Sequence, residues 1–283
     1  MRKFVHLHLH TQYSLLDGAS RIDSVFEKCK EFDMPAVAIT DHGNMYGAYQ
    51  FFTKAKKAGI KPVIGCEFYV TEDLNVKTGK VMGEFNHLIL LARNNEGYKS
   101  LVKLNSIAFV DGYYYKPRID FDTLSKHSAG LICLSACLAG ELPRLIMANR
   151  LEDARLLAKK YKDLFGEYYY LELQDHGIPE QKLVNAELIK ISRELNIPLV
   201  ATNDVHYIEK KDAEAQDVLM CIQMQKTLDD KNRLKFSTDE FYLKNGDEME
   251  SLFSFVPEAL DNTLKIAEMC DVQICRENLI PNY

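Results

Sequence analysis

The chain has 283 residues, of which 47% are hydrophobic and 27% are charged, as is typical of a globular protein. This length suits one large α/β domain, or one domain with a small appendage. No apolar run approaches the roughly 20 residues that cross a bilayer, and no apolar signal core follows the N-terminus, so we expect a cytoplasmic protein without a membrane partner. The formal charge of -6 excludes a general attraction to nucleic acid but leaves room for a local basic patch.

The seven cysteines do not form a recognisable disulfide framework. Their number is odd, their spacing is scattered, and no CxxC pair occurs. We therefore expect most of them to be small buried hydrophobic residues.

Short apolar runs alternate with helix-like stretches along most of the chain. Strands are predicted at residues 4–10, 36–40, 62–70, 87–92, 130–137, 168–173 and 198–202. Helices are predicted at residues 21–32, 46–58, 98–109, 151–164 and 180–195, and a loop or hairpin at 73–83. The alternation predicts an α/β fold with parallel strands, in a closed or nearly closed barrel of seven units or, alternatively, an open doubly wound sheet. In both folds the functional groups belong at the C-terminal ends of the strands.

The pattern changes after Tyr207, so we predict a barrel over residues 1–208 and a small, mainly helical appendage over 209–283. Within the appendage, helices are predicted at 209–228, 247–253 and 257–270, and a short strand-like piece at 236–243. Part of its partner surface is expected to lie outside this chain.

The segment VHLHLH at residues 5–10 is the most informative motif. In a strand, the alternation places His6, His8 and His10 on one face and the aliphatic side chains on the other. Imidazole is the commonest metal ligand among side chains, and a strand gives no structural reason for neighbouring imidazoles. We assign His8 and His10 to a metal site and His6 to a supporting or core position.

Other potential ligands lie near the ends of the later strands, and Asp204 and His206 repeat the spacing of His8 and His10. The predicted ligand set is His8, His10, Asp17, His42, Glu67, His87, Cys137, Asp204 and His206. For His87 a structural role is an equal alternative, and for Cys137 taken alone a structural role is favoured. His127 is expected at the surface, and the orientation of Glu172 stays open.

This set exceeds the roughly four to six ligands of one ion, so we predict two or three divalent ions of zinc, manganese or iron. Such a centre activates water and holds phosphate oxygens, which favours phosphoester hydrolysis. The catalytic role is assigned to His8, His10, Glu67 and Asp204 within the cluster.

Four further residues are candidates for substrate binding. Lys116 and Arg118 lie in the loop GYYYKPRID, which can hold a phosphate and stack a base, or can be a purely structural loop. His176 follows the sixth predicted strand, where substrate contact and plain loop exposure are balanced. Tyr13 is placed at the mouth of the site.

Six ordered motifs resemble those of the PHP (polymerase and histidinol phosphatase) family: HLHTQYSLLDG, AITDHGNMYG, PVIGCEFYV, NHLILLARN, LICLSACLAGE and ATNDVHY. More narrowly, the chain is similar to the N-terminal part of bacterial DNA polymerase III alpha subunits. The resemblance implies a distorted seven-stranded (β/α)7 TIM-like barrel and a trinuclear metal site formed by the ligand set above.

The same resemblance implies a metal-dependent 3′–5′ exonuclease that proofreads the 3′ end of a DNA primer, with the other polymerase domains and replisome subunits as partners. No paired aspartates of the polymerase type occur, so the fragment itself is not expected to polymerise DNA. Two alternatives stay open: a metal-stabilised structural module without nuclease activity, and a small-molecule phosphomonoesterase, against which the appendage argues.

Overall fold

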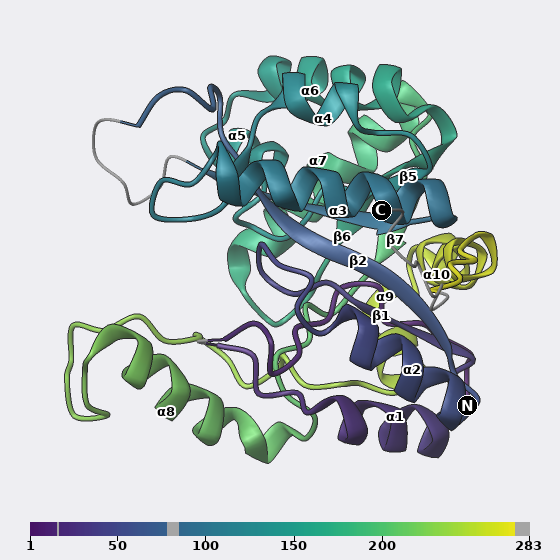
Figure 1. Ribbon diagram of the computed structural model, residues 1–283, viewed down its shortest axis with the longest axis vertical. Coiled ribbons are helices and arrows are strands. Elements are labelled where there is room, and N and C mark those ends of the chain that lie inside the picture. Colours follow the sequence, from purple (N-terminus) through teal and green to yellow (C-terminus); the bar gives the residue numbers. More distant parts are fainter. Residues whose placement is uncertain (16, 78–84, 275–283) are drawn as a thin grey trace, which may run out of the picture.

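The computed structural model describes residues 1–15, 17–77 and 85–274, arranged around one curled sheet with helices outside it (Figure 1). The strands are β1 (Ala36–Ile39), β2 (Lys61–Val70), β3 (Asn86–Ala92), β4 (Arg118–Ile119), β5 (Leu131–Leu134), β6 (Tyr169–Leu173) and β7 (Leu199–Ala201). Their order in the sheet is β1-β2-β3-β5-β6-β7, with β4 paired to β2 outside this path. The predicted α/β class is confirmed, and every predicted strand except the first corresponds to an observed one.

The prediction of an all-parallel sheet is wrong. Strand β3 runs antiparallel to both of its neighbours, β2 and β5, whereas the remaining pairs are parallel. An apolar run buried on both faces reads the same in either direction, so composition alone does not reveal this reversal. The predicted loop at 73–83 falls between β2 and β3, and its residues 78–83 lie outside the described part of the chain.

Residues 4–10 form an extended segment rather than a ladder-forming strand. On one side the Ala38 amide donates to the His6 carbonyl at 2.8 Å. On the other side the His10 amide donates to the Val205 carbonyl at 2.8 Å, and the Val205 amide donates to the His8 carbonyl at 3.1 Å. The segment thus spans the gap between β1 and the residues after β7, which do not pair directly with each other in the described sheet. This bridge is irregular and β3 is reversed, so the sheet departs from a regular barrel of seven β/α units.

Two apolar clusters lie on opposite faces of the sheet. Alternate strand residues such as Val63, Ile89 and Val200 join an inner cluster, which helix α10 (Pro257–Met269) completes with Ile266. The intervening residues, such as Ile64, pack outward against the helices. Strands alternate their side chains between two faces, so membership of a cluster fixes which strand residues point inward.

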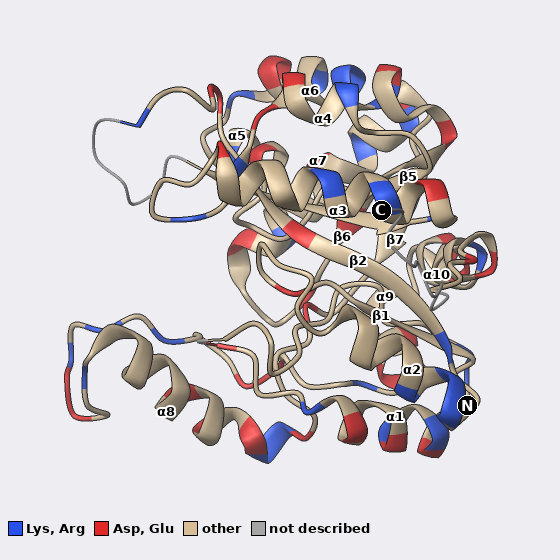
Figure 2. Cartoon of the chain, viewed as in Figure 1, with Lys and Arg blue, Asp and Glu red and all other residues tan. Residues whose placement is uncertain are grey.

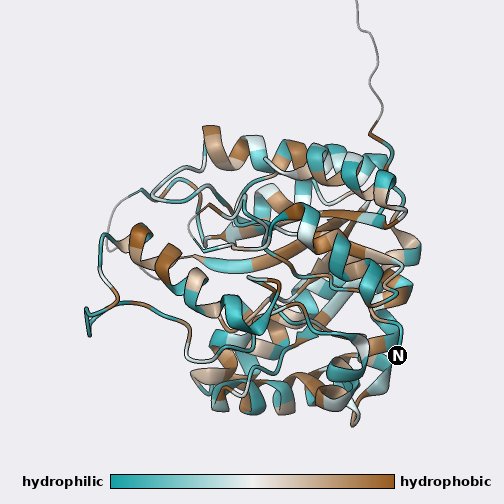
Figure 3. Cartoon of the chain, turned by 90° about the horizontal axis from the view of Figure 1, so that it is seen from below, coloured by the Kyte–Doolittle hydropathy of each residue, from teal (hydrophilic) through white to brown (hydrophobic). Residues whose placement is uncertain are grey.

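The helices follow the predicted positions closely. They are α1 (Ile22–Glu31), α2 (Ala48–Ala58), α3 (Asn95–Val110), α6 (Leu151–Phe165) and α7 (Pro179–Leu195), with α4 (Phe121–Lys126) and α5 (Glu141–Met147) as short additions. Local signals set their ends: the Asn94 side chain accepts from the Gly97 amide at the start of α3, and Gly59 closes α2 at φ +74°. Figure 2 shows charged residues mainly on the helices and loops, and Figure 3 shows the hydrophobic strands between amphipathic helices.

The C-terminal part contains a 3₁₀ turn (Lys210–Asp212), α8 (Ala213–Met224), α9 (Gly246–Phe253) and α10. The strand-like piece predicted at 236–243 is wrong, because only a single bridge between Tyr242 and Tyr207 forms there. Helix α10 packs against β7, and α8 extends away from the sheet in Figure 1. The boundary at residue 208 stays a prediction. Within the described ranges, no helix has the length and apolarity needed to span a membrane.

Candidate metal centre

The predicted ligands converge at one end of the sheet. His8 and His10 come from the bridging segment, His42 follows β1, and Asp204 and His206 follow β7. Two strand residues, Glu67 and His87, lie on the inner face of the sheet. Residues an even number of positions apart in a strand point to the same face, and Glu67 follows the inner residue Val63 by four positions in β2, whereas His87 precedes the inner residue Ile89 by two in β3. Segments distant in sequence therefore direct nitrogen and oxygen atoms into one buried space.

The largest group consists of His8, His10, Glu67 and Asp204, all of them buried. The Nε2 atoms of His8 and His10 lie 3.1 Å apart, and each lies 3.1 Å from Asp204 Oδ1. Glu67 Oε2 lies 2.7 Å from His8 Nε2 and 3.6 Å from His10 Nε2. Donors that share one tetrahedral ion at about 2.1 Å are separated by about 3.4 Å, so this spacing fits a single cation.

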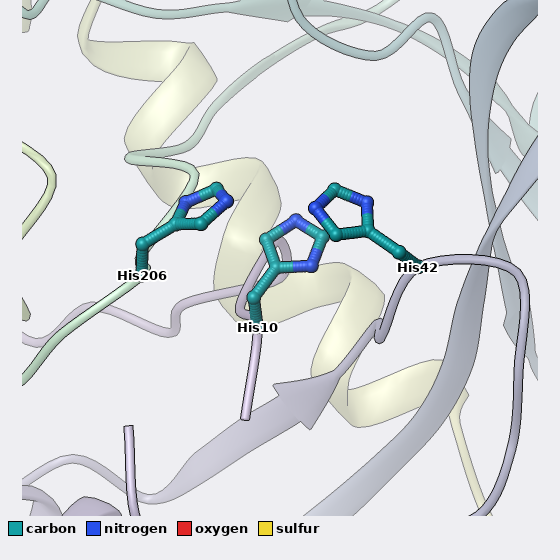
Figure 4. A group of neighbouring side chains, drawn as sticks. All are labelled: His10, His42 and His206. Atoms are coloured by element: carbon teal, nitrogen blue, oxygen red, sulfur yellow. The ribbon is translucent and has the colours of Figure 1, made fainter. Parts of the chain in front are cut away.

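Two further groups adjoin the first. Around Glu67 Oε1, His42 Nδ1 lies at 2.9 Å and His87 Nδ1 at 2.5 Å. His10, His42 and His206 form the other group, in which the ring of His10 lies 3.9 Å from that of His42 and 4.4 Å from that of His206 (Figure 4). The shared residues Glu67, His10 and His42 link the three groups into one cluster.

Asp17 and Cys137 lie at the margin of this cluster rather than within one of its groups. Asp17 Oδ2 is 3.1 Å from His42 Nε2. Cys137 Sγ is 3.7 Å from His87 Nδ1, and burial, together with the nearby carboxylates Asp204 and Glu67, raises the pKa of its thiol well above the usual range. Both residues therefore stand beside a ligand group, each in contact with one of its histidines.

The charges within the cluster favour a bound cation. Burial opposes ionisation of Asp204, but His8 and His206 outweigh it and hold the Asp204 pKa well below its usual value. Likewise, His87 and His42 outweigh burial and hold the pKa of Glu67 well below its usual value. Asp204 Oδ1 is buried and makes no well-formed hydrogen bond, although Nε2 of His8 and Nε2 of His10 each lie 3.1 Å from it. A buried carboxylate oxygen that faces two imidazole nitrogens in this way is best satisfied by a cation between them. The donor set therefore fits divalent metal ions.

Several supporting residues were not predicted. The Nδ1–H of His8 donates to Glu172 Oε1 at 2.7 Å, which directs the Nε2 lone pair of His8 into the cluster. Ser14 Oγ lies 3.0 Å from His10 Nδ1 and donates to the buried Asp41 at 2.8 Å. Tyr170 of β6 belongs to the inner cluster, so Glu172, two residues later in the same strand, also points inward. This alternation is the signal that could have predicted the orientation of Glu172.

Lys116 and Arg118, two of the predicted substrate-binding residues, lie in different surroundings. Lys116 lines a pocket at the mouth of the cluster, together with His42 and Asp17. Arg118 is buried, and its guanidinium donates to the carbonyls of Gly112, Leu74 and Val76. The structure therefore separates the two cations of this loop.

His176 and Tyr13, the other two predicted substrate-binding residues, each interact with neighbouring protein groups. His176 is buried, stacks on Phe241 at 3.8 Å, and hydrogen-bonds the Asn203 carbonyl at 2.9 Å. Burial lowers its pKa to about 4. The Tyr13 hydroxyl donates to Gln50 at 2.6 Å.

Two other histidines lie apart from the cluster. His6 is buried, with Nε2 2.8 Å from the Lys244 carbonyl, and His127 follows helix α4. The described cysteines are all free, in agreement with the predicted lack of a disulfide framework.

Comparison with known proteins identifies the family of the chain. The family model of the PHP domain matches residues 6–176, and the chain belongs to this family. The described part beyond the match supplies Asp204 and His206, two of the predicted ligands.

The relatives narrow the resemblance further. The chain is 52% identical to the DNA polymerase III subunit alpha of Borreliella burgdorferi over 95% of its length, and 48% identical to that of Treponema pallidum over 99%. The subunit of Thermus aquaticus is 45% identical over 96% of the chain. These relatives confirm the predicted resemblance to the alpha subunits. The chain spans about a quarter of the length of these relatives, with 24%, 24% and 23% of each covered.

Proposed function

We propose that this chain is a metal-dependent phosphodiesterase that removes nucleotides from the 3′ end of DNA, as the proofreading exonuclease of a replicative polymerase. The observation that carries the proposal is the buried set of His8, His10, Glu67 and Asp204, whose donor atoms have the spacing of ligands on one ion. The neighbouring groups built on His42 add positions for a second and third ion. The remaining polymerase domains, replisome subunits and primer DNA are the proposed partners.

Each part of the site has a role in this chemistry. Divalent ions bound here would supply an activated water and a positive charge for the phosphate oxygens. Glu172 fixes the ring orientation of His8, and Ser14 does so for His10. Lys116, at the mouth, is placed to meet a phosphate of the incoming strand.

The test is hydrolysis of a 5′-labelled primer with a 3′ mismatch, with the chain loaded with Mn²⁺ or Zn²⁺. We expect products shortened stepwise from the 3′ end. Asp204→Asn should reduce the rate by on the order of 100-fold or more, because it removes a charged ligand from the four-residue group. The matched control is Asp122→Asn, an exposed aspartate of α4. Absence of cleavage by the loaded chain and by a full-length subunit that contains it would overturn the proposal, and turnover of free phosphomonoesters alone would favour the small-molecule alternative.

A second candidate is a structural module whose ions stabilise the polymerase. Complete burial of His8 and His10 favours it, because ions held there are well placed to tie the bridging segment to the sheet. This function predicts ion-dependent stability without cleavage.

A further inference from the structure

A pocket of about 290 Å³ opens directly beside the metal cluster. Two cluster residues, Asp17 and His42, form its inner end. Aromatic side chains dominate the outer wall, and among the described residues that line the pocket Lys116 is the one Lys or Arg. An occupant of this pocket would thus contact aromatic rings, one cation and the metal cluster together.

The aromatic wall is formed by Tyr46, Phe109, Tyr113 and Tyr115, which come from three separate segments. Tyr46, Tyr113 and Tyr115 are exposed by 56%, 52% and 64%, respectively. The ring of Phe109 lies 6.1 Å from that of Tyr46 and 6.4 Å from that of Tyr113, in a stacked orientation with Tyr113. Large aromatic side chains are seldom left this exposed side by side unless a ligand covers them.

The loop that carries the tyrosines is held in place from beneath. The buried Arg118 guanidinium bonds to the Gly112 carbonyl at 3.1 Å, and the Arg118 carbonyl lies only 2.0 Å from where a Cβ on Gly112 would be. Tyr115 adopts φ +60°, a left-handed conformation that is costly for a bulky residue. The loop therefore presents Tyr113 and Tyr115 on a fixed base.

The pocket is connected to the cluster through a short series of contacts. The Lys116 ammonium lies 5.2 Å from the Tyr69 ring, and that ring stacks on His42 at 6.4 Å. A nucleotide has the matching parts: a planar ring for the aromatic wall, a phosphate for Lys116, and a scissile bond for the ions. Stacking on aromatic side chains accepts any base, as an exonuclease requires.

We propose that the aromatic wall binds the unpaired nucleobases at the 3′ end of single-stranded DNA, and so draws frayed ends into the cluster. The inference rests on the proposed function for its substrate, and it adds the subsite that selects unpaired bases. A paired terminus keeps its bases stacked in the duplex and gains nothing from the wall.

The test measures binding without cleavage, by fluorescence anisotropy in EDTA, to a 5′-labelled single-stranded octamer. A matched octamer carries abasic sites at its three 3′-terminal positions. The natural chain should bind the intact octamer at least about tenfold more tightly, given the usual strength of base–aromatic stacking. Tyr113→Ala with Tyr115→Ala should abolish this preference. Tyr113→Phe with Tyr115→Phe should keep it, as should Phe255→Ala, which removes an exposed aromatic residue outside the pocket lining.

Equal binding of the two octamers by the natural chain would overturn the inference, as would a preference that survives the double alanine variant. The primer assay separates this result from the proposed function. Cleavage without base preference refutes the aromatic subsite alone. Base preference without cleavage, by the loaded chain and by the full-length subunit alike, supports the subsite and refutes the nuclease.

Discussion

Single side chains decide whether the cluster can hold ions, and Glu172 illustrates this dependence. One of its oxygens accepts from His8, Thr202 and Gln174, whereas Oε2 is buried without a hydrogen-bond partner. A carboxylate behind a metal-binding imidazole raises its basicity and fixes its ring. Because its second oxygen is buried and unpaired, the same carboxylate destabilises the fold when no cation is near.

We therefore expect Glu172→Gln to weaken Zn²⁺ affinity by about 10- to 100-fold in calorimetric titration. The melting temperature of the metal-free variant should be unchanged or higher, because a buried charge is removed. Glu180→Gln, at an exposed position in α7, is the control. Unchanged affinity, or a loss of affinity that merely follows a loss of folding, would contradict the positioning role.

Among the connecting elements, the tyrosine loop depends on Arg118. Its guanidinium donates to three backbone carbonyls, one bond being buried and two half-buried. Arg118→Met should lower the free energy of unfolding by about 2–4 kcal/mol in urea titration, because these carbonyls lose their donors. Lys116→Met is the matched control, and its cost should stay under about 1 kcal/mol, since it removes only a contact with the Tyr69 ring. An equal loss of unfolding free energy in the two variants would refute the anchoring role of Arg118.

The same elements show what sequence reasoning can and cannot reach. Strand and helix positions were predictable because apolar runs and capping residues are local signals. The direction of β3 was not predictable. A strand that is buried on both faces lacks the apolar–polar alternation that is typical of antiparallel strands with one exposed face. The sequence alone does not tell Lys116 and Arg118 apart, because both are cations of one loop. Only the packing under Gly112 separates the buried Arg118, which anchors the loop, from the half-buried Lys116.

For the site, alternation in VHLHLH was enough to pair His8 with His10, but it could not show that His6 turns to the Lys244 carbonyl. Glu172 needed the strand register, which is a tertiary property. Asp17 and Cys137 were both predicted as ligands, although for Cys137 taken alone a structural role was favoured, and the structure places both at the margin of the cluster.

At the scale of the whole molecule, bound ions should act as cross-links between distant segments. A ligand at 100 times its dissociation constant stabilises the native state by about 2.7 kcal/mol. We therefore expect the melting temperature, followed by circular dichroism, to fall by roughly 5–10 °C when EDTA replaces Zn²⁺ or Mn²⁺, and to recover when the metal is restored. His10→Asn should melt at the same temperature with and without metal. A melting temperature indifferent to chelator would refute the ion-binding role in both proposed functions.

The bridging segment at residues 4–10 also bears on how the chain is made. Its hydrogen bonds reach Ala38 on one side and Val205 on the other, so the second partner leaves the ribosome long after the segment itself. His8 and His10 are synthesised first, but the group they form with Asp204 is complete only after residue 204 has been added. Such long-range closure slows folding. Metal uptake would then mark the end of domain synthesis, and a nascent chain arrested before Val205 would hold its histidines without a completed site.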